Sequence, residues 1–298
     1  MGLDDGVGDV LLEVARRRAD IARVVGGLFC CGGRIINGLR SELVLCQVGE
    51  SASSQIASAS SKSEVSSALV LTFEGVRDVL LMSKKLASSW LKNIGKLKPN
   101  KSQKPVDIAM LLIIYASSDQ TKKKAVEAVF KSKIKDGTFK ETLIDETVEA
   151  LGEILKTYFN ELLKLLSILL NAPDGSVSKF ASYFLNECFL RMESLYCRMI
   201  ILEQLESVRL DNKHAKNVLE LLHNLTVKFP AKVANYVTLI MLLLDSMPGM
   251  KVLEVRQLMD IICSVAWGSQ NDSSLDMGSL QDEIIMIVQK QLRCPDSK

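Results

Sequence analysis

Apolar residues recur every three or four positions through most of the chain after residue 105, the spacing of one face of an α-helix. The clearest run extends from Leu151 to Leu169 and ends at the turn sequence Asn-Ala-Pro-Asp-Gly at 171–175. Similar runs follow at 177–195, 218–229, 233–244, 255–262 and 284–288. Each apolar face must be buried against another element, so the pattern predicts a series of packed helices.

Neighbouring helices group into pairs, which we predict at about 107–134, 141–170, 177–208, 213–246 and 251–292. Their spacing is close to the roughly 40–47 residues of a HEAT-like repeat, although the pairs share little sequence identity. Thr138 and Glu141 have the spacing of a capping box at the start of the second pair. We therefore predict an all-α fold, an irregular α-solenoid of antiparallel helix pairs. A compact all-α bundle is the alternative that the pattern leaves open.

The first part of the chain has a different pattern. A helix is predicted from Val10 to Val25, and the paired glycines at 26–27 and 32–33 break the helical pattern after it. Nine of the residues from 51 to 67 are serine, a composition typical of a mobile linker. The sequence therefore leaves residues 1–66 as a poorly determined N-terminal segment with a Ser-rich linker at about 47–67, and it predicts an α-solenoid scaffold domain at 68–298.

Composition supports the helical interpretation and limits the cellular setting. Aromatic residues make up 5% of the chain and prolines number six, fewer than strand-rich domains usually contain. The seven cysteines show no CxxC or His/Cys cluster, which favours reduced thiols in an intracellular protein over disulfides or zinc. The longest apolar stretches, 108–116 and 239–244, are shorter than the roughly 20 residues that span a bilayer, so we expect no membrane partner. No signal peptide is readable at the N-terminus.

The residues predict no catalytic site, no metal site and no cofactor. His214 and His223 are nine positions apart, which places them on opposite sides of a single helix and prevents a shared metal. We expect one partly buried and one surface imidazole. The glycine pairs match neither GxGxxG nor a P-loop, and acidic pairs such as Glu141 and Asp145 are interpreted as solvated helix faces.

Lysines are concentrated between residues 84 and 140, where few acidic residues accompany them. On the helix that begins near Thr121, Lys124, Lys131 and Lys135 lie opposite the apolar positions. A solvent-exposed basic ridge of this kind suits sequence-independent contact with nucleic-acid phosphates, although an ordinary solvated face is the alternative. The candidate DNA contacts are Lys122, Lys123, Lys124, Lys131, Lys133 and Lys135. The ridge contains no arginine or aromatic residue, so base readout is not predicted.

Several short motifs follow one another in a fixed order after residue 104. Lys-Pro-Val-Asp-Ile at 104–108 leads into the apolar segment 110–115, and Phe-Lys-Ser-Lys-Ile-Lys-Asp-Gly occupies 130–137 before Phe139. Later motifs are Val-Arg-Gln-Leu at 255–258, continuing to Ala266, Ser-Gln-Asn at 269–271, Leu-Gln-Asp-Glu at 280–283 and Val-Gln-Lys-Gln-Leu at 288–292. This ordered set resembles the Fanconi anaemia group D2 family over about residues 68–298. It is far more specific than helical periodicity, and residues 1–66 do not contribute to it.

The resemblance implies a non-enzymatic nuclear scaffold for DNA interstrand crosslink repair. Members of the family form an α-solenoid that pairs with the Fanconi group I paralogue, clamps duplex or branched DNA and is monoubiquitinated by the Fanconi core ubiquitin ligase. The family's acceptor is the second lysine of a Lys-x-Lys pair, and Lys298 matches the first. The resemblance therefore implies an acceptor two residues beyond Lys298, and a chain that is an N-terminal fragment or a truncated product. A generic HEAT-like protein–protein adaptor is the alternative function.

Overall fold

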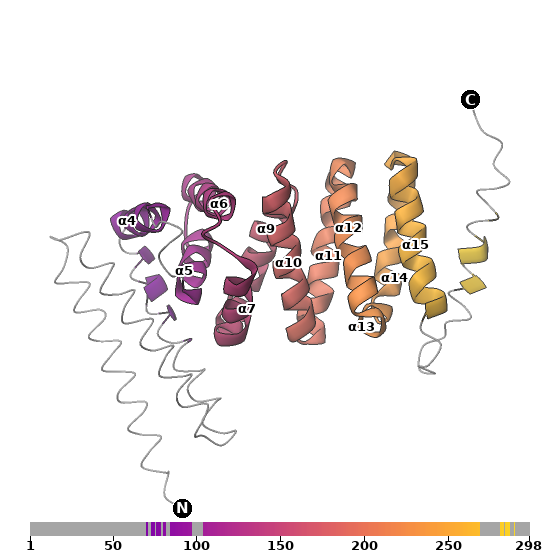
Figure 1. Ribbon diagram of the computed structural model, residues 1–298, viewed down its shortest axis with the longest axis horizontal. Helices are drawn as coiled ribbons and strands as arrows, with labels where there is room; N and C mark the ends of the chain where they lie inside the picture. Colours follow the sequence, from indigo (N-terminus) through magenta and orange to yellow (C-terminus); the bar gives the residue numbers. More distant parts are fainter. Residues whose placement is uncertain are drawn as a thin grey trace, which may run out of the picture. The chain divides into compact units, whose positions relative to one another are not determined.

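The computed structural model describes residues 84–96 and 104–268, together with scattered positions within 70–81 and 281–289. These residues form a succession of helices, and no strand occurs among them (Figure 1). The predicted all-α class and its solenoid of antiparallel helix pairs are therefore confirmed. The predicted helix at 10–25 and the Ser-rich linker lie outside the described residues.

The chain divides into two compact units, Met1–Glu187 and Cys188–Lys298, with the boundary inside a helix. The first unit contains α4 (Lys84–Gly95), α5 (Pro105–Ala116), α6 (Gln120–Lys135), α7 (Glu141–Ala150), α8 (Gly152–Thr157), α9 (Phe159–Leu170) and most of α10 (Gly175–Arg191). The second contains the end of α10, then α11 (Ser194–Leu210), the 3-10 helix η1 (Asn212–His214), α12 (Ala215–Lys228), α13 (Pro230–Ala234), α14 (Val237–Ile240), the 3-10 helix η2 (Met241–Gly249) and α15 (Val252–Gly268). The sequence did not predict this boundary, and the single 68–298 domain stays a prediction.

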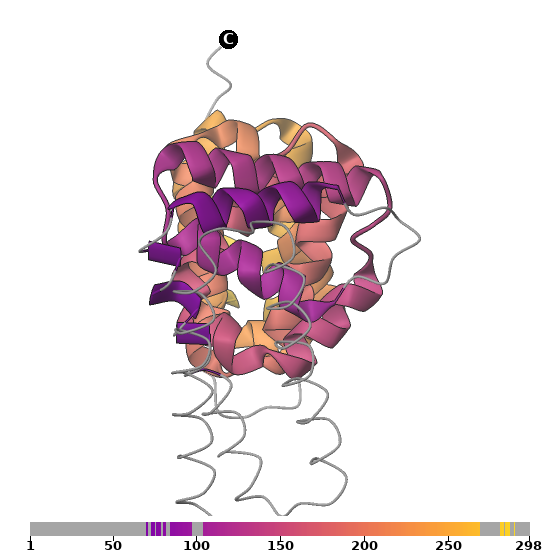
Figure 2. The same ribbon diagram turned by 90° about the vertical axis from the view of Figure 1, so that its left-hand side faces the viewer.

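Helix α5 is the centre of the first unit. All of its residues from Pro105 to Tyr115 are buried, as expected for a helix that is apolar on every side. It packs against α4, α6, α7 and α9, and Figure 2 shows α4, in indigo, running beside α6. Asp107 lies in the first turn of α5, where its Oδ2 accepts a hydrogen bond of 3.1 Å from the backbone N–H of Lys104. A carboxylate at this position is stabilised by the positive end of the helix dipole.

Helix α12 is the main buried element of the second unit. It packs against α11, α13 and α15. Its fully buried side chains include those of Val218, Leu221, Leu222 and Leu225, which follow the predicted three-four spacing, and also those of Ala215 and Leu219. The apolar stripe thus lies where the sequence predicted it.

Two predicted helices are interrupted in the structure. The run from 151 to 169 breaks at Tyr158, whose φ of −112° and ψ of 27° separate α8 from α9. The segment after Pro230 forms α13, α14 and η2 in place of one helix through 244. Tyr158 and Ile240 are nevertheless buried, so the apolar spacing continues through both interruptions and gives no sign of them.

The predicted capping box at Thr138 and Glu141 is wrong. Thr138 belongs to the turn that ends α6, where its N–H lies 2.9 Å from the carbonyl oxygen of Lys133. Gly137 precedes it with a φ of 71°, a backbone conformation that favours glycine after a helix end. The N-cap residue of α7 is Lys140, and its side chain makes no capping hydrogen bond.

We expect the fully buried side chains of α12 to contribute more to the stability of the fold than its exposed side chains do. Leu222→Ala removes a side chain that is 0% exposed and should lower the free energy of unfolding by about 2–5 kcal/mol. Leu210→Ala is the matched control, because Leu210 is 77% exposed and its truncation should change stability by less than about 0.5 kcal/mol. Urea denaturation followed by circular dichroism measures both effects. Equal midpoints for the two variants would contradict the packing described for α12.

Candidate nucleic-acid interface on helix α6

Contacts at both ends and along one side fix the orientation of α6. At its start, the Asp119 carboxylate accepts a hydrogen bond of 3.0 Å from the N–H of Lys122, and at its end the chain turns at Gly137. The buried apolar side chains are spaced four residues apart and are those of Val126, Phe130 and Ile134. The rings of Phe130 and Phe139 also meet edge to face, with centroids 5.4 Å apart.

This orientation places three of the predicted lysines on the outer side of the helix. Lys124 and Lys135 are exposed and Lys131 is half-buried. We call these three residues the α6 ridge. Lys122 and Lys123 are also half-buried, and Lys123 Nζ lies 5.3 Å from the centroid of the Tyr115 ring, within cation–π range. The exposure of Lys124 and Lys135 agrees with the sequence, whereas the contact of the ridge with phosphate stays a prediction.

Lys133 does not lie on the ridge, which corrects the prediction for this residue. Its position seven residues after Val126 puts it on the same side of the helix as that buried valine, and Lys133 is only 3% exposed. Its Nζ forms an ion pair of 2.9 Å with the carboxylate of Asp136. Burial raises the pKa of Asp136, but hydrogen bonds from Thr138 and Lys133 outweigh it and hold that pKa below its ordinary value. Lys133 therefore stabilises the end of α6 and is not available to DNA.

Lys135 is also engaged, although it is exposed. Its Nζ lies 3.0 Å from Oδ2 of Asp174, the residue that precedes α10. The other carboxylate oxygen of Asp174 accepts hydrogen bonds from the N–H and the hydroxyl of Ser176, at 3.0 and 2.6 Å. These hydrogen bonds from Ser176, followed by that from Lys135, hold the pKa of Asp174 well below its usual range. No ion pair to Lys124 or Lys131 occurs among the described residues, so these two carry the available positive charge of the ridge.

The two histidines lie on separate elements. His214 ends η1, is half-buried and has its Nδ1 3.1 Å from the hydroxyl of Ser207. His223 lies on α12 and is exposed. The expected combination of one partly buried and one surface imidazole is confirmed, although the two residues do not share one helix.

Cysteines and acidic residues form no metal-binding group within the part of the chain that the structure describes. There, no cluster of three or more His, Cys, Asp or Glu side chains is placed to hold a metal ion. Cys188, Cys197 and Cys263 are not joined in disulfides. None of the described helices is both long enough and apolar enough to cross a membrane.

Stacked helix pairs, each buried through an apolar stripe, define a helical-repeat protein of the α-solenoid class. The chain belongs to the FancD2 family. A family model described as "Fanconi anaemia protein FancD2 nuclease" matches residues 39–298. The match begins well before residue 68, so it extends the resemblance found in the sequence towards the N-terminus.

Curated relatives carry the same family name. The chain is 25% identical over 244 residues to the Fanconi anemia group D2 protein of Gallus gallus, which covers 80% of this chain and 16% of that protein. It is 27% identical over 226 residues to the homolog of Rattus norvegicus, and 27% identical over 188 residues to that of Drosophila melanogaster. These matches cover 75% and 62% of this chain. The chain thus spans about a sixth of the length of the Gallus gallus relative.

Removal of the Lys135 ammonium group should raise the pKa of Asp174 towards its ordinary value of about 3.9. In the wild type the carboxylate stays charged, and the ion pair is kept, as the pH falls through that ordinary value, because the folded-state pKa is depressed. In Lys135→Met the hydrogen bonds from Ser176 remain, so the pKa should rise only part of the way. Carboxyl ¹³C NMR titration measures the change. Lys140→Met, which neutralises another exposed lysine, should leave the titration of Asp174 where it is.

Proposed function

We propose that this chain is a non-enzymatic scaffold in DNA interstrand crosslink repair that acts in the nucleus and contacts DNA through the α6 ridge. Membership of the FancD2 family supports a role in the Fanconi pathway. The observation that carries the DNA contact is the outward orientation of Lys124 and Lys131, without ion-pair partners among the described residues. The chain spans about a sixth of the Gallus gallus relative, so the scaffold role is proposed for a protein of that relative's length.

The mechanism is electrostatic and does not read the base sequence. Lys124 and Lys131 are seven residues apart, which separates their α-carbons by about 10 Å along the helix axis. At this separation each ammonium group can meet a different phosphate of duplex or branched DNA. Such binding releases condensed counterions, so its affinity falls as the salt concentration rises. Neither residue has a planar group that would stack on a base or pair with one.

Within the proposed assembly the chain pairs with the Fanconi group I paralogue, and together the two proteins clamp DNA. The helical surface supplies the protein contacts, since stacked repeats present long continuous faces. Regulation in this proposal comes from monoubiquitination by the Fanconi core ubiquitin ligase. The acceptor would be a lysine just beyond the position of Lys298, which is the nearest lysine that matches the family motif.

Charge reversal on the ridge should weaken DNA binding. For Lys124→Glu/Lys131→Glu we expect a lower affinity for a 30-base-pair duplex, and a slope of log K against log salt reduced by about 1.8, because about 0.9 is lost for each phosphate contact. Fluorescence anisotropy at several salt concentrations measures both quantities. The matched control is Lys216→Glu/Lys228→Glu, which changes charge equally at two exposed positions of α12. Equal affinity and equal slope for the ridge variant and the wild type would refute the DNA role of the ridge.

The same protein preparations test the non-enzymatic part of the proposal. Labelled duplex and branched DNA should remain intact after incubation with the wild-type chain and Mg²⁺ or Mn²⁺. Cleavage products that persist in the ridge variant would show an activity that the proposal excludes. The DNA contact of the ridge and the absence of nuclease activity are therefore tested independently of each other.

Pull-down with the Fanconi group I paralogue should separate the repair scaffold from a generic HEAT-like adaptor. We expect retention of that paralogue at protein concentrations where an unrelated solenoid of similar size is not retained, because a specific partner buries a complementary surface. Binding should persist in Lys124→Glu/Lys131→Glu if the DNA and protein contacts occupy different faces. Equal capture of both solenoids would favour the generic adaptor.

A further inference from the structure

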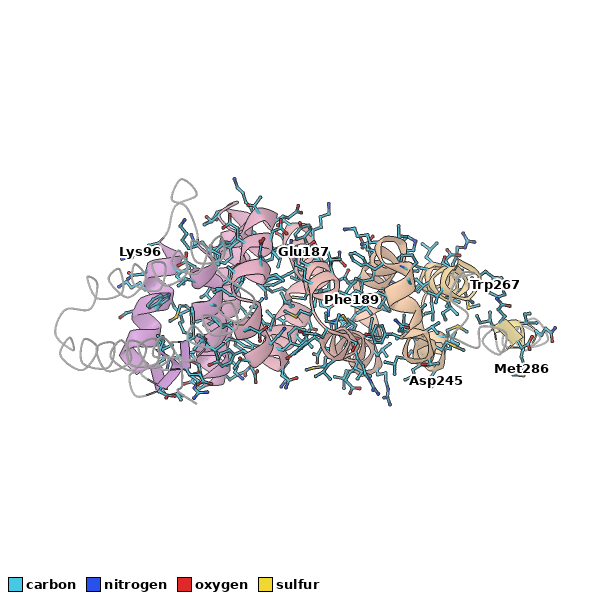
Figure 3. All side chains as sticks on the ribbon, turned by 90° about the horizontal axis from the view of Figure 1, so that it is seen from below. Lys96, Glu187, Phe189, Asp245, Trp267 and Met286 are labelled. Atoms are coloured by element: carbon cyan, nitrogen blue, oxygen red, sulfur yellow. The ribbon has the colours of Figure 1, made fainter. Side chains whose placement is uncertain are left out.

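The C-terminal end of α10 is capped by a lysine about forty residues further along the chain. Lys232 lies on α13, and its Nζ donates hydrogen bonds to the carbonyl oxygens of Phe189, Leu190 and Met192, at 2.5, 3.2 and 3.1 Å. The same ammonium group lies 5.4 Å from the centroid of the Phe189 ring. Phe189, labelled in Figure 3, therefore meets Lys232 through both its backbone and its side chain.

This arrangement satisfies a general requirement of helices. The last carbonyl groups of a helix have no partner within it, and that end of the helix carries partial negative charge. An ammonium group supplies three donors and a full positive charge, which matches three acceptors at one corner. Pro230 begins α13, and the buried Val233 and Ala234 hold that helix against the rest of the second unit, so Lys232 is positioned by its own short helix.

Two further side chains bind the same corner, the turn from α10 to α11 at residues 189–194. The Cys197 thiol donates to the carbonyl oxygens of Phe189 and Met192, at 3.3 and 3.6 Å. The Tyr236 hydroxyl donates to the carbonyl oxygen of Ser194 at 3.0 Å. Cys197 is 0% exposed, and burial raises the pKa of its thiol, an effect that the charge of Lys232 partly offsets. The Cys197 thiol is thus buried beneath the same corner that Lys232 binds.

We propose that Lys232 is a charge-dependent latch that holds this corner closed and keeps the Cys197 thiol covered. Loss of the positive charge removes the ammonium donor from three carbonyl groups at once, and leaves those of Phe189 and Met192 with only the weak thiol donor of Cys197 among the described residues. A partly buried carbonyl group that loses its strong donor gains by reaching water, so the corner opens. Lys232 lies on α13 and Cys197 on α11, outside the packing of α12 on α15, so we expect the opening to be local. This inference is independent of the DNA contact proposed for α6.

The covered thiol provides the readout. The wild type, Lys232→Met and Lys232→Arg, each as the full 298-residue chain, are treated with N-ethylmaleimide under native conditions, and the rate at each cysteine is followed by mass spectrometry. We expect at least about tenfold faster alkylation of Cys197 in Lys232→Met, and a rate closer to that of the wild type in Lys232→Arg, which keeps the charge. Lys228→Met is the matched control, because it neutralises an exposed lysine of α12.

Each alternative outcome decides against the latch. An unchanged rate at Cys197 in Lys232→Met would show that the lysine does not hold the corner. Equal acceleration at Cys197 and at the half-buried Cys263 would indicate a general loss of stability. Equal rates in Lys232→Met and Lys232→Arg would show that shape, and not charge, closes the corner. Amide hydrogen exchange at residues 192–197 should follow the alkylation rates if the latch is correct.

Discussion

Burial of one apolar side of each helix determines which charged groups reach solvent. On α6, the burial of Val126, Phe130 and Ile134 turns Lys124 and Lys131 outwards and carries Lys133 into the interior. The DNA contact proposed for this helix therefore depends on its packing as much as on its composition. A helix with the same lysines and a shifted apolar stripe would present a different set of charges.

Lysine has two distinct roles in this structure. On the α6 ridge its charge lies in water, where single interactions are weak and only several together bind a polyanion. Lys133 and Lys232 instead use their donors at the ends of helices. Lys133 pairs with the carboxylate of Asp136, and Lys232 donates to the carbonyl groups of Phe189, Leu190 and Met192. A count of lysines along the sequence does not distinguish these two roles. To tell them apart, one must know how far each lysine side chain is buried.

Sequence predicted most of the helices because their apolar spacing is local. It did not show the break at Tyr158, since the buried positions keep their spacing through it. The burial of Lys133 could have been predicted from the sequence, because a separation of seven residues from Val126 places both residues on one side of a helix. The contact of Lys232 with α10 had no local signal, since its partners are backbone carbonyl groups about forty residues away.

The division of the chain within α10 follows from the aromatic rings on that helix. Phe180 stacks on Phe139 of the first unit, with centroids 6.4 Å apart, whereas Phe189 packs against Phe229 and Tyr236 of the second. One continuous helix thus contributes to two apolar cores, and Lys232 holds its last turn to the second. Sequence searches for a domain boundary look for glycine, proline or serine between elements. A boundary made by a shared helix has none of these, because it arises from which core each turn of the helix enters.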